Sequence, residues 1–96
     1  MRIKSYYVYI ITNRYNTVFY VGMTNNLLRR ISEHQKGVYQ DLFSQRYYVY
    51  KLVYYEITTD VYSAISREKQ IKGWMRYKKV DLILSMNPNL DELVIQ

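Results

Sequence analysis

Three runs of β-branched and aromatic residues, separated by stretches with helical spacing, constrain the fold of this chain more than any other feature. The runs are residues 6–12 (YYVYIIT), 17–22 (TVFYVG) and 47–57 (YYVYKLVYYEI), and their composition favours strands. Residues 13–16 (NRYN) have the composition of a turn that joins the first two runs as a hairpin. The third run is apolar on both alternating faces apart from two charged residues, which suggests the central strand of a sheet covered by helices.

The hairpin places two tyrosines on one face of the predicted sheet. If the turn has four residues, Thr12 pairs with Thr17, and Tyr9 then lies directly opposite Tyr20. Opposed residues of an antiparallel pair project from the same face, with Cβ atoms about 5 Å apart. We therefore expect the two hydroxyls to share one surface, although an ordinary cross-strand aromatic pair would explain the same two residues.

Apolar residues at helical spacing predict one helix after the second run, at residues 26–36. They predict two more after the third run, at residues 61–74 and 78–86. Gly37 ends the first of these helices, which has its N-cap at Thr24 or Asn25. Residues 38–46 form a polar connection, and a tail at 90–95 is expected to pack back on the core. The order of elements is therefore β-β-α-β-α-α, an α/β chain in which residues 1–96 form a single domain, since domains typically run to about 100–150 residues.

Composition excludes several classes of chemistry. The chain has no cysteine and one histidine, which rules out disulfides, cysteine-ligated metal clusters, thiol catalysis and two-histidine mechanisms. No apolar run approaches the roughly 18 residues of a membrane span, and the first residues do not read as a signal peptide. We therefore expect a soluble protein of the cytoplasm with no membrane partner.

Charge and tyrosine content indicate an anionic partner. Fourteen Lys and Arg against eight Asp and Glu give a net charge of +6, and the chain has 13 tyrosines. A basic surface fits nucleic acid first and an acidic membrane second. Tyrosine supplies stacking faces for bases, but it is also ordinary strand and core material, and most of the 13 are expected to be half-buried sheet residues.

Five residues carry groups suited to chemistry on a phosphodiester: Tyr9, Tyr20, Arg30, His34 and Glu68. Each also has a structural explanation: an aromatic pair for the tyrosines, a solvated helix arginine, a satisfied core histidine, and an ion pair between Glu68 and Lys72. Arg30 and His34 are neighbours at i and i+4 beside an apolar stripe. Glu68 is the strongest signal, because it falls within the apolar stripe of its own helix, where a carboxylate costs free energy unless it is paired or binds a metal.

Together these residues fit metal-assisted cleavage of phosphodiester bonds. A single carboxylate such as Glu68 can hold Mg²⁺, or Mn²⁺, while the ion keeps several waters. The metal and Arg30 would neutralise the charge that develops on the phosphate and the leaving oxygen. A tyrosine hydroxyl could position or deprotonate water, although its pKa near 10 requires a nearby cation. Basic residues expected to contact the DNA backbone are Arg29, Lys69, Lys72 and Arg76.

The same residues resemble a known family. Tyr7-Val8-Tyr9 and Tyr20-Val21-Gly22 match the two tripeptides of a GIY-YIG nuclease domain, in the order and at the spacing of that family. Residues 24–30 (TNNLLRR) with Glu33-His34, and residues 67–74 (REKQIKGW), match the small stand-alone bacterial type related to the N-terminal domain of the excinuclease C subunit. The resemblance covers about residues 6–93.

The resemblance implies a three-stranded antiparallel sheet flanked by helices, and a DNA endonuclease that depends on Mg²⁺. It implies Tyr9 and Tyr20 as the motif tyrosines, Arg30 as the phosphate-stabilising arginine, His34 as a site histidine and Glu68 as the Mg²⁺ ligand. Family members nick one strand or, as dimers or with partner domains, cut both strands. Target selection would come from this domain, from a homodimer or from a partner protein. They act in processes such as DNA repair and mobile-element transfer.

Three positions depart from the family pattern. Tyr7 replaces the first glycine, Met23 stands where some members have a catalytic lysine, and Val80 stands where many carry an asparagine. The alternative to a nuclease is a non-catalytic nucleic-acid-binding module on the same fold. A third class is a domain that binds an anionic membrane or a partner protein. The sequence does not support it, because no predicted helix has a lipid-facing aromatic stripe with a basic opposite face.

Overall fold

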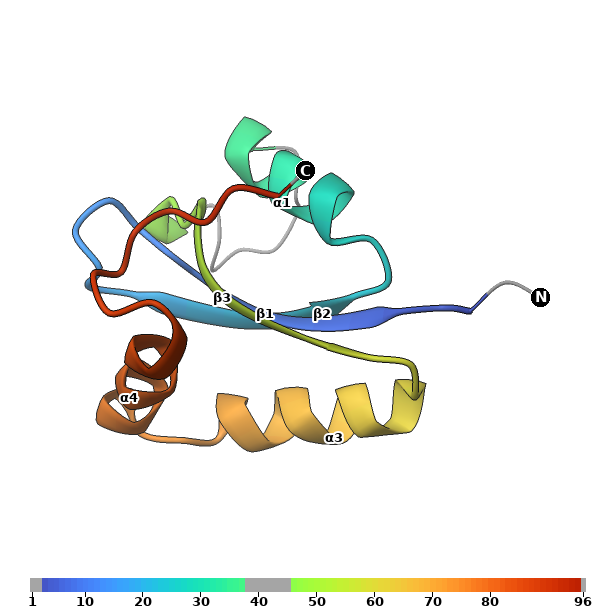
Figure 1. Ribbon diagram of the computed structural model, residues 1–96. Helices are drawn as coiled ribbons and strands as arrows, with labels where there is room; N and C mark the ends of the chain where they lie inside the picture. The colour runs from blue at the N-terminus through green and yellow to red at the C-terminus, as the bar shows by residue number, and fades with distance from the viewer. Residues whose placement is uncertain (1–2, 38–45, 96) are drawn as a thin grey trace.

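The computed structural model describes residues 3–37 and 46–95 and confirms the predicted order of elements (Figure 1). Its strands are β1 (Tyr6–Thr12), β2 (Phe19–Thr24) and β3 (Lys51–Thr58). Its helices are α1 (Leu27–Lys36), α3 (Val61–Lys72) and α4 (Arg76–Met86). The predicted connection at 38–46 lies outside the described residues apart from Arg46.

The sheet is antiparallel, with strand order β2-β1-β3, so the prediction that the third strand is central is wrong. Both faces of β3 are apolar because helices cover both sides of the sheet. A second neighbouring strand is not needed to explain this composition. The C-terminal tail also packs along it, since the backbone N–H of Leu93 donates to the carbonyl oxygen of Leu52 at 2.8 Å. An edge strand covered in this way has the sequence of a central one.

The β1–β2 hairpin has a different register from the one expected. Tyr9 lies opposite Gly22 and Tyr20 lies opposite Ile11, so the predicted direct pairing of the two tyrosines is wrong by two residues. The loop spans residues 13–18 rather than 13–16, because Oδ1 of Asn13 accepts hydrogen bonds from the N–H groups of Thr17 at 2.8 Å and Val18 at 3.3 Å. A shift of two residues preserves the face on which each side chain lies, so both tyrosines still share one surface.

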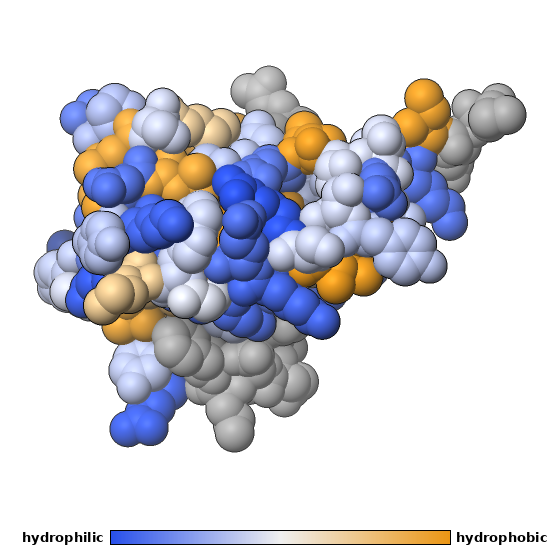
Figure 2. Space-filling view, turned by 90° about the horizontal axis from the view of Figure 1, so that it is seen from below, coloured by the Kyte–Doolittle hydropathy of each residue, from blue (hydrophilic) through white to orange (hydrophobic). Residues whose placement is uncertain are grey.

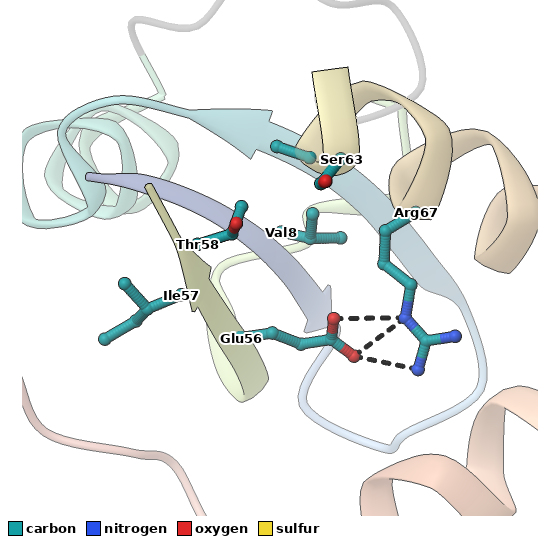
Figure 3. Close-up of a pocket in the computed structure, with 7 residues that line it drawn as sticks. Val8, Glu56, Ile57, Thr58, Ser63 and Arg67 are labelled. Atoms are coloured by element: carbon teal, nitrogen blue, oxygen red, sulfur yellow. Dashed lines mark hydrogen bonds and ion pairs between the residues drawn. The ribbon is translucent and has the colours of Figure 1, made fainter. Parts of the chain in front are cut away.

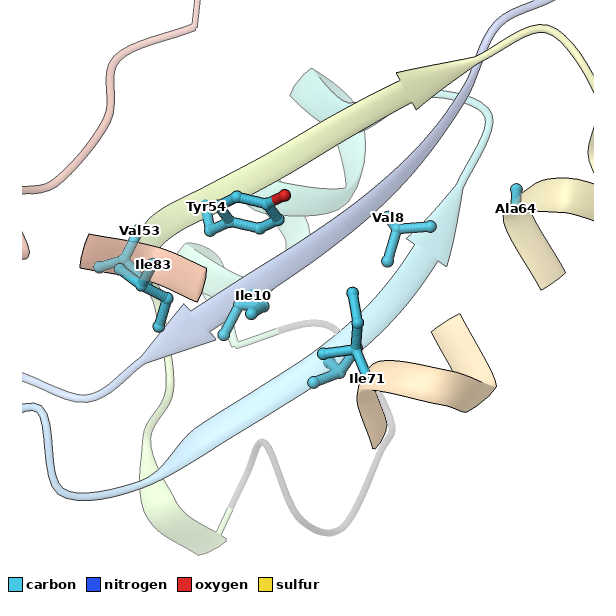
Figure 4. Close-up of a cluster of buried hydrophobic side chains, with 8 residues drawn as sticks. Val8, Ile10, Val53, Tyr54, Ala64, Ile71 and Ile83 are labelled. Carbon is cyan, nitrogen blue, oxygen red and sulfur yellow. The ribbon is translucent and has the colours of Figure 1, made fainter. Parts of the chain in front are cut away.

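Helices cover the sheet on both faces, with α1 on one side and α3 and α4 on the other (Figure 1). Alternate residues of β1 therefore enter different cores. The core beneath α3 and α4 contains Val8, Ile10, Val21, Val53, Ala64, Ile71 and Ile83 (Figure 4). The core beneath α1 contains Tyr9, Ile11, Leu27, Ile31, Val49 and Leu52, with Leu93 and Ile95 of the tail packed against it. The expectation that the tail packs back is confirmed.

Local capping sets the helix boundaries. Oδ1 of Asn26 accepts from the N–H of Arg29 at 3.1 Å, so the N-cap of α1 is Asn26, which directly follows the two predicted candidates, Thr24 and Asn25. Gly37 ends the helix with a φ of 70° as expected. Asp60 caps α3, and hydrogen bonds from the Ser63 hydroxyl and the Tyr62 N–H lower the pKa of its carboxyl. α4 begins at Arg76, two residues before the predicted start.

The end of α4 is joined to the sheet by one buried asparagine. Asn87 is only 5% exposed, and its Nδ2 donates to the carbonyl oxygens of Val53 at 3.0 Å and Asp91 at 2.8 Å. Its Oδ1 accepts from the N–H of Asp91 at 3.1 Å. Val53 lies where the pairing of β1 with β3 shifts by one residue, so this amide satisfies a carbonyl at an irregular point of the sheet.

We expect Asn87→Ala to lower the free energy of unfolding by about 1–3 kcal/mol, because it leaves a buried carbonyl oxygen without its donor. Urea denaturation of the variant and of wild type measures this loss. Asn89→Ala, a change at an exposed residue two positions further on, is the matched control and should be neutral. Equal stability of Asn87→Ala and the control would show that the tail is not held through this amide.

Candidate active site

Tyr9, Tyr20 and His34 form one cluster between the sheet and α1. The Tyr9 hydroxyl oxygen and Nε2 of His34 lie 3.2 Å apart and share a hydrogen bond. The ring centroids are 6.4 Å apart for the two tyrosines, 6.0 Å for Tyr9 and His34, and 5.5 Å for Tyr20 and His34. Tyr9 and His34 are buried and Tyr20 is partly exposed, so Tyr20 is the member of the cluster that a ligand can reach.

Gly22 makes this cluster possible. It lies opposite Tyr9 in the hairpin, and a Cβ atom built on it would meet both Cζ and the hydroxyl oxygen of Tyr9 at 2.5 Å. Any side chain at this position would therefore displace the tyrosine ring from the surface of β2. The glycine of the second tripeptide is required by the tyrosine of the first, because that ring crosses directly over it towards His34.

Arg30 lies on the side of α1 that faces β2. Leu28 and Gln35, on the opposite side of the helix, border a cavity shared with the C-terminal tail, and that tail runs along β3. With about 100° between successive residues, Arg30 points nearly opposite to both of them. Its Nε forms an ion pair with Oε1 of Glu33 at 3.2 Å.

Glu68 comes from the other layer. Ala64 and Ile71 are fully buried and define the inward line of α3, and Arg67 and Glu68 lie on opposite sides of that line. Arg67 points towards β3, so Glu68 lies on the side of β2, the strand against which α3 mainly packs. The side chain of Glu68 is 23% exposed, and its Oε1 forms an ion pair with Nζ of Lys72 at 3.5 Å.

The apolar stripe around Glu68 is narrower than the sequence suggests. Ile65 and Met75 were expected to belong to it, but both are exposed. Glu68 therefore occupies the margin of the buried face rather than its centre, which gives its carboxylate access to solvent. The structural alternative, an ion pair with Lys72, is present as well.

The candidate residues are distributed over β2 and the helices on both sides of the sheet. Tyr20 lies on the strand itself, Arg30 on its side of α1, and Glu68 on its side of α3. Because β2 is an edge strand, groups from both layers can approach its outer edge. Tyr9 and His34 lie behind Tyr20, in the interior.

A polar network on β3 and α3 was not identified from the sequence (Figure 3). Nε of Arg67 donates to both carboxylate oxygens of Glu56 at 3.0 Å, and Nη2 of Arg67 lies 2.9 Å from Oε2 of the same carboxylate. The Tyr54 hydroxyl donates to the same carboxylate at 2.5 Å. The signal was the negative charge of Glu56 within a largely apolar strand. This network holds α3 to β3 and so sets the side of the helix on which Glu68 lies.

The network perturbs the acid–base behaviour of its members. Burial raises the pKa of Tyr54 to about 12, and the hydrogen bond to Glu56 and the negative charge of Glu56 contribute to this shift. The hydrogen bonds from Arg67 to Glu56 raise the pKa of that guanidinium, which stays charged throughout. The hydroxyl of Tyr54 is therefore a fixed donor at neutral pH.

The predicted basic residues do not all have the same surroundings. Arg29, Lys69 and Lys72 are exposed, with Arg29 on the α1 layer and both lysines on the opposite one. Arg76 donates to the carbonyl oxygens of Asn16 and Thr17 in the hairpin loop, and its guanidinium lies 5.5 Å from the centre of the Phe19 ring. Figure 2 shows the face of α3 and α4, where hydrophilic side chains are interspersed with apolar patches.

Two further observations concern the described part of the chain. Residues 3–37 and 46–95 contain no group of three or more histidine or acidic side chains that could hold a metal ion. Among the helices of those residues, none is long and apolar enough to span a bilayer.

Comparison with known proteins identifies the class to which this fold and site belong. A family model described as the GIY-YIG catalytic domain matches residues 5–81, and the chain therefore belongs to the GIY-YIG family. It is 35% identical over 82 residues to a UPF0213 protein of Syntrophus aciditrophicus (strain SB), a match that covers 85% of this chain and 92% of the relative. It is 40% identical over 79 residues to a UPF0213 protein of Clostridium perfringens (strain 13 / Type A), covering 82% of this chain and 83% of the relative.

A solved structure agrees with these relatives. The solution NMR structure of a UPF0213 protein from Bacillus halodurans superposes with a TM-score of 0.57 at 25% identity, covering 92% of each chain. The expected fold, three antiparallel strands flanked by helices in the order β-β-α-β-α-α, is confirmed.

We expect Gly22→Ala to destabilise the protein by about 1–3 kcal/mol, the usual cost of forcing extra volume into a packed site. Chemical denaturation measures the loss, and Gly73→Ala is the matched control, because a Cβ there meets nothing closer than 3.5 Å. In a Tyr9→Leu background, which removes the atoms that clash, the cost of Gly22→Ala should shrink. An equal cost in both backgrounds would contradict the proposed contact.

The raised pKa of Tyr54 predicts a pH dependence of stability. The folded protein retains the Tyr54 hydroxyl proton up to about pH 12, whereas the unfolded chain releases it near pH 10. The contribution of this hydroxyl to the free energy of unfolding is therefore complete below pH 10 and is lost as the pH approaches 12. The difference in Tm between wild type and Tyr54→Phe should therefore shrink over this range. Tyr62→Phe, at an exposed tyrosine, is the control, and its difference in Tm from wild type should not change over this range. A constant difference for Tyr54→Phe would contradict the proposed effect of the Glu56 network on stability.

Proposed function

We propose that this protein is a DNA endonuclease that hydrolyses phosphodiester bonds with Mg²⁺, or Mn²⁺, as its cofactor. The observation that supports the proposal is that Tyr20 lies on an edge strand, with Arg30 on α1 and Glu68 on α3, in a chain of the GIY-YIG family. DNA repair and mobile-element processing are the processes to which such an activity belongs. The net charge of +6 supports DNA as the partner.

Glu68 has the properties of a Mg²⁺ ligand. Mg²⁺ in proteins is commonly held by one or two carboxylates and keeps several waters, so a single partly exposed carboxylate is sufficient. The competing ion pair with Lys72 is long and lies on the surface, where such pairs contribute little to stability. When bound, the metal would act as a Lewis acid on the phosphate and stabilise the leaving oxygen.

The other site residues bind and orient the substrate. Arg30 can rotate from Glu33 to a phosphate, where its planar guanidinium matches two oxygens and neutralises the charge that develops during cleavage. The Tyr20 hydroxyl would hydrogen-bond the attacking water. Tyr9 and His34 hold the Tyr20 ring from behind, and their shared hydrogen bond keeps both polar groups satisfied in the core.

A non-catalytic nucleic-acid-binding module is the alternative function. Met23 favours it, because the position after Gly22 carries no lysine. Target selection in either case would come from a homodimer, from a partner protein or from the domain itself.

We expect Glu68→Gln to abolish Mg²⁺-dependent nicking and to leave the fold intact. Its affinity for DNA without metal should hold or improve, because a negative charge close to the phosphate is removed. Nicking of a supercoiled plasmid, Tm and DNA binding in the presence of a chelator are measured on the same preparation. Asp81→Asn, which neutralises an exposed carboxylate of α4, is the matched control and should nick at the wild-type rate.

Two results would overturn the assignment of Glu68. Undiminished nicking by a folded Glu68→Gln variant would show that the carboxylate is not a ligand. A fall in Tm, with nicking reduced only in proportion to the folded fraction, would show that the ion pair with Lys72 is structural.

A further inference from the structure

An open cavity lined with tyrosines lies at the end of the sheet where β1 ends and the chain enters β3. Its volume is about 610 Å³, within the range of about 300–1,000 Å³ that is common for ligand sites. The lining residues are Asn13, Arg14, Tyr15, Tyr47, Tyr48 and Tyr50. Four of these six side chains are aromatic, and the charged one is cationic.

The tyrosine rings are presented to solvent rather than packed in a core. Tyr15 is 74% exposed and Tyr48 is 65% exposed, and the Tyr48 ring centroid lies 5.3 Å from that of Tyr50. The backbone of Tyr48 has a φ of 51°, in the left-handed region that a bulky residue seldom adopts. Strain of this kind is concentrated at functional sites, where the surrounding structure maintains it.

Cations accompany the rings on both sides of the cavity. The guanidinium carbon of Arg14 lies 5.5 Å from the centre of the Tyr15 ring, and that of Arg46 lies 5.5 Å from the centre of the Tyr47 ring. Among the described residues that line the cavity there is no carboxylate. The surface therefore combines flat stacking faces with positive charge.

We propose that this cavity binds an unpaired nucleotide segment of the nucleic-acid substrate. Bases would stack on Tyr15 and Tyr48, and the phosphates beside them would lie near Arg14 and Arg46. Aromatic faces with basic neighbours are the means by which proteins bind single strands, whereas the bases of a duplex already stack on one another and offer no open faces.

This inference rests on the proposed function and specifies its substrate. Tyr9 lies on β1, and Asn13, which lines the cavity, directly follows Thr12 at the end of that strand. Four residues at about 3.3 Å each separate the cavity from the cluster of Tyr9, Tyr20 and His34 by about 13 Å. One nucleic-acid molecule can span both. The preferred substrate is then a duplex that carries a single-stranded tail, with the tail in the cavity.

Binding of labelled oligonucleotides by the whole chain tests the proposal. The probes are a blunt duplex, the same duplex with an unpaired DNA tail and the same duplex with an RNA tail, each measured by fluorescence anisotropy in a chelator. Wild type should bind the tailed duplex more tightly than the blunt one. Tyr15→Ala and Tyr48→Ala should each weaken binding of the tailed duplex about tenfold, within the range known for stacking of one base, without affecting the blunt duplex.

Two further variants separate stacking from other effects. Tyr48→Phe should bind the tailed duplex as wild type does, because it keeps the stacking face, and Tyr62→Ala, at an exposed tyrosine of α3, should change nothing. Equal binding of tailed and blunt duplexes by wild type, or equal losses on both by the tyrosine variants, would overturn the proposal. A stronger loss on the RNA tail than on the DNA tail would support the cavity and assign its strand to RNA.

Failure of this proposal is distinguishable from failure of the endonuclease activity. A tail preference that depends on Tyr15 and Tyr48, in a protein that does not nick with Mg²⁺, would support the cavity and reject the nuclease. Mg²⁺-dependent nicking that is lost in Glu68→Gln, without any tail preference, would support the nuclease and reject the cavity.

Discussion

The passage of the Tyr9 ring over Gly22 is the contact on which the arrangement of the candidate site depends. Because no side chain stands in the way, a tyrosine from the central strand reaches across the edge strand and hydrogen-bonds His34 on the helix above. That bond sets the position of α1 relative to the sheet. The ring of His34 in turn packs against Tyr20, the partly exposed member of the cluster.

The opposite layer is positioned by a charged interaction. Glu56 on β3 and Arg67 on α3 form a multiply hydrogen-bonded ion pair, and Tyr54 completes the carboxylate's set of donors. An arginine that is fixed on one side of a helix determines where its neighbours point, so Glu68 is directed to the other side, towards β2. The helices of the two layers are therefore oriented by unrelated means, one by a close aromatic contact and one by an ion pair.

Much of the fold was predictable because the signals are local. Aromatic and β-branched runs identified the strands, and Gly37 identified the end of α1. The hairpin register was not predictable, because Asn13 accepts backbone hydrogen bonds from residues 17 and 18 and so lengthens the loop by two residues. The place of β3 was also missed, since a tail that covers an edge gives that strand the composition of a central one.

The sequence by itself determined the elements, their order, the family and the face shared by Tyr9 and Tyr20, because alternation, capping and motif spacing act over a few residues. Only the tertiary structure decided which strand is at the edge, which side of α3 carries Glu68, and that Tyr15 and Tyr48 meet beside one cavity. These outcomes depend on contacts between residues far apart in the chain, such as Glu56 with Arg67 and Leu52 with Leu93. The sequence pattern around each of these residues does not indicate its partner, because nothing in the neighbouring residues distinguishes it from other residues of the same type.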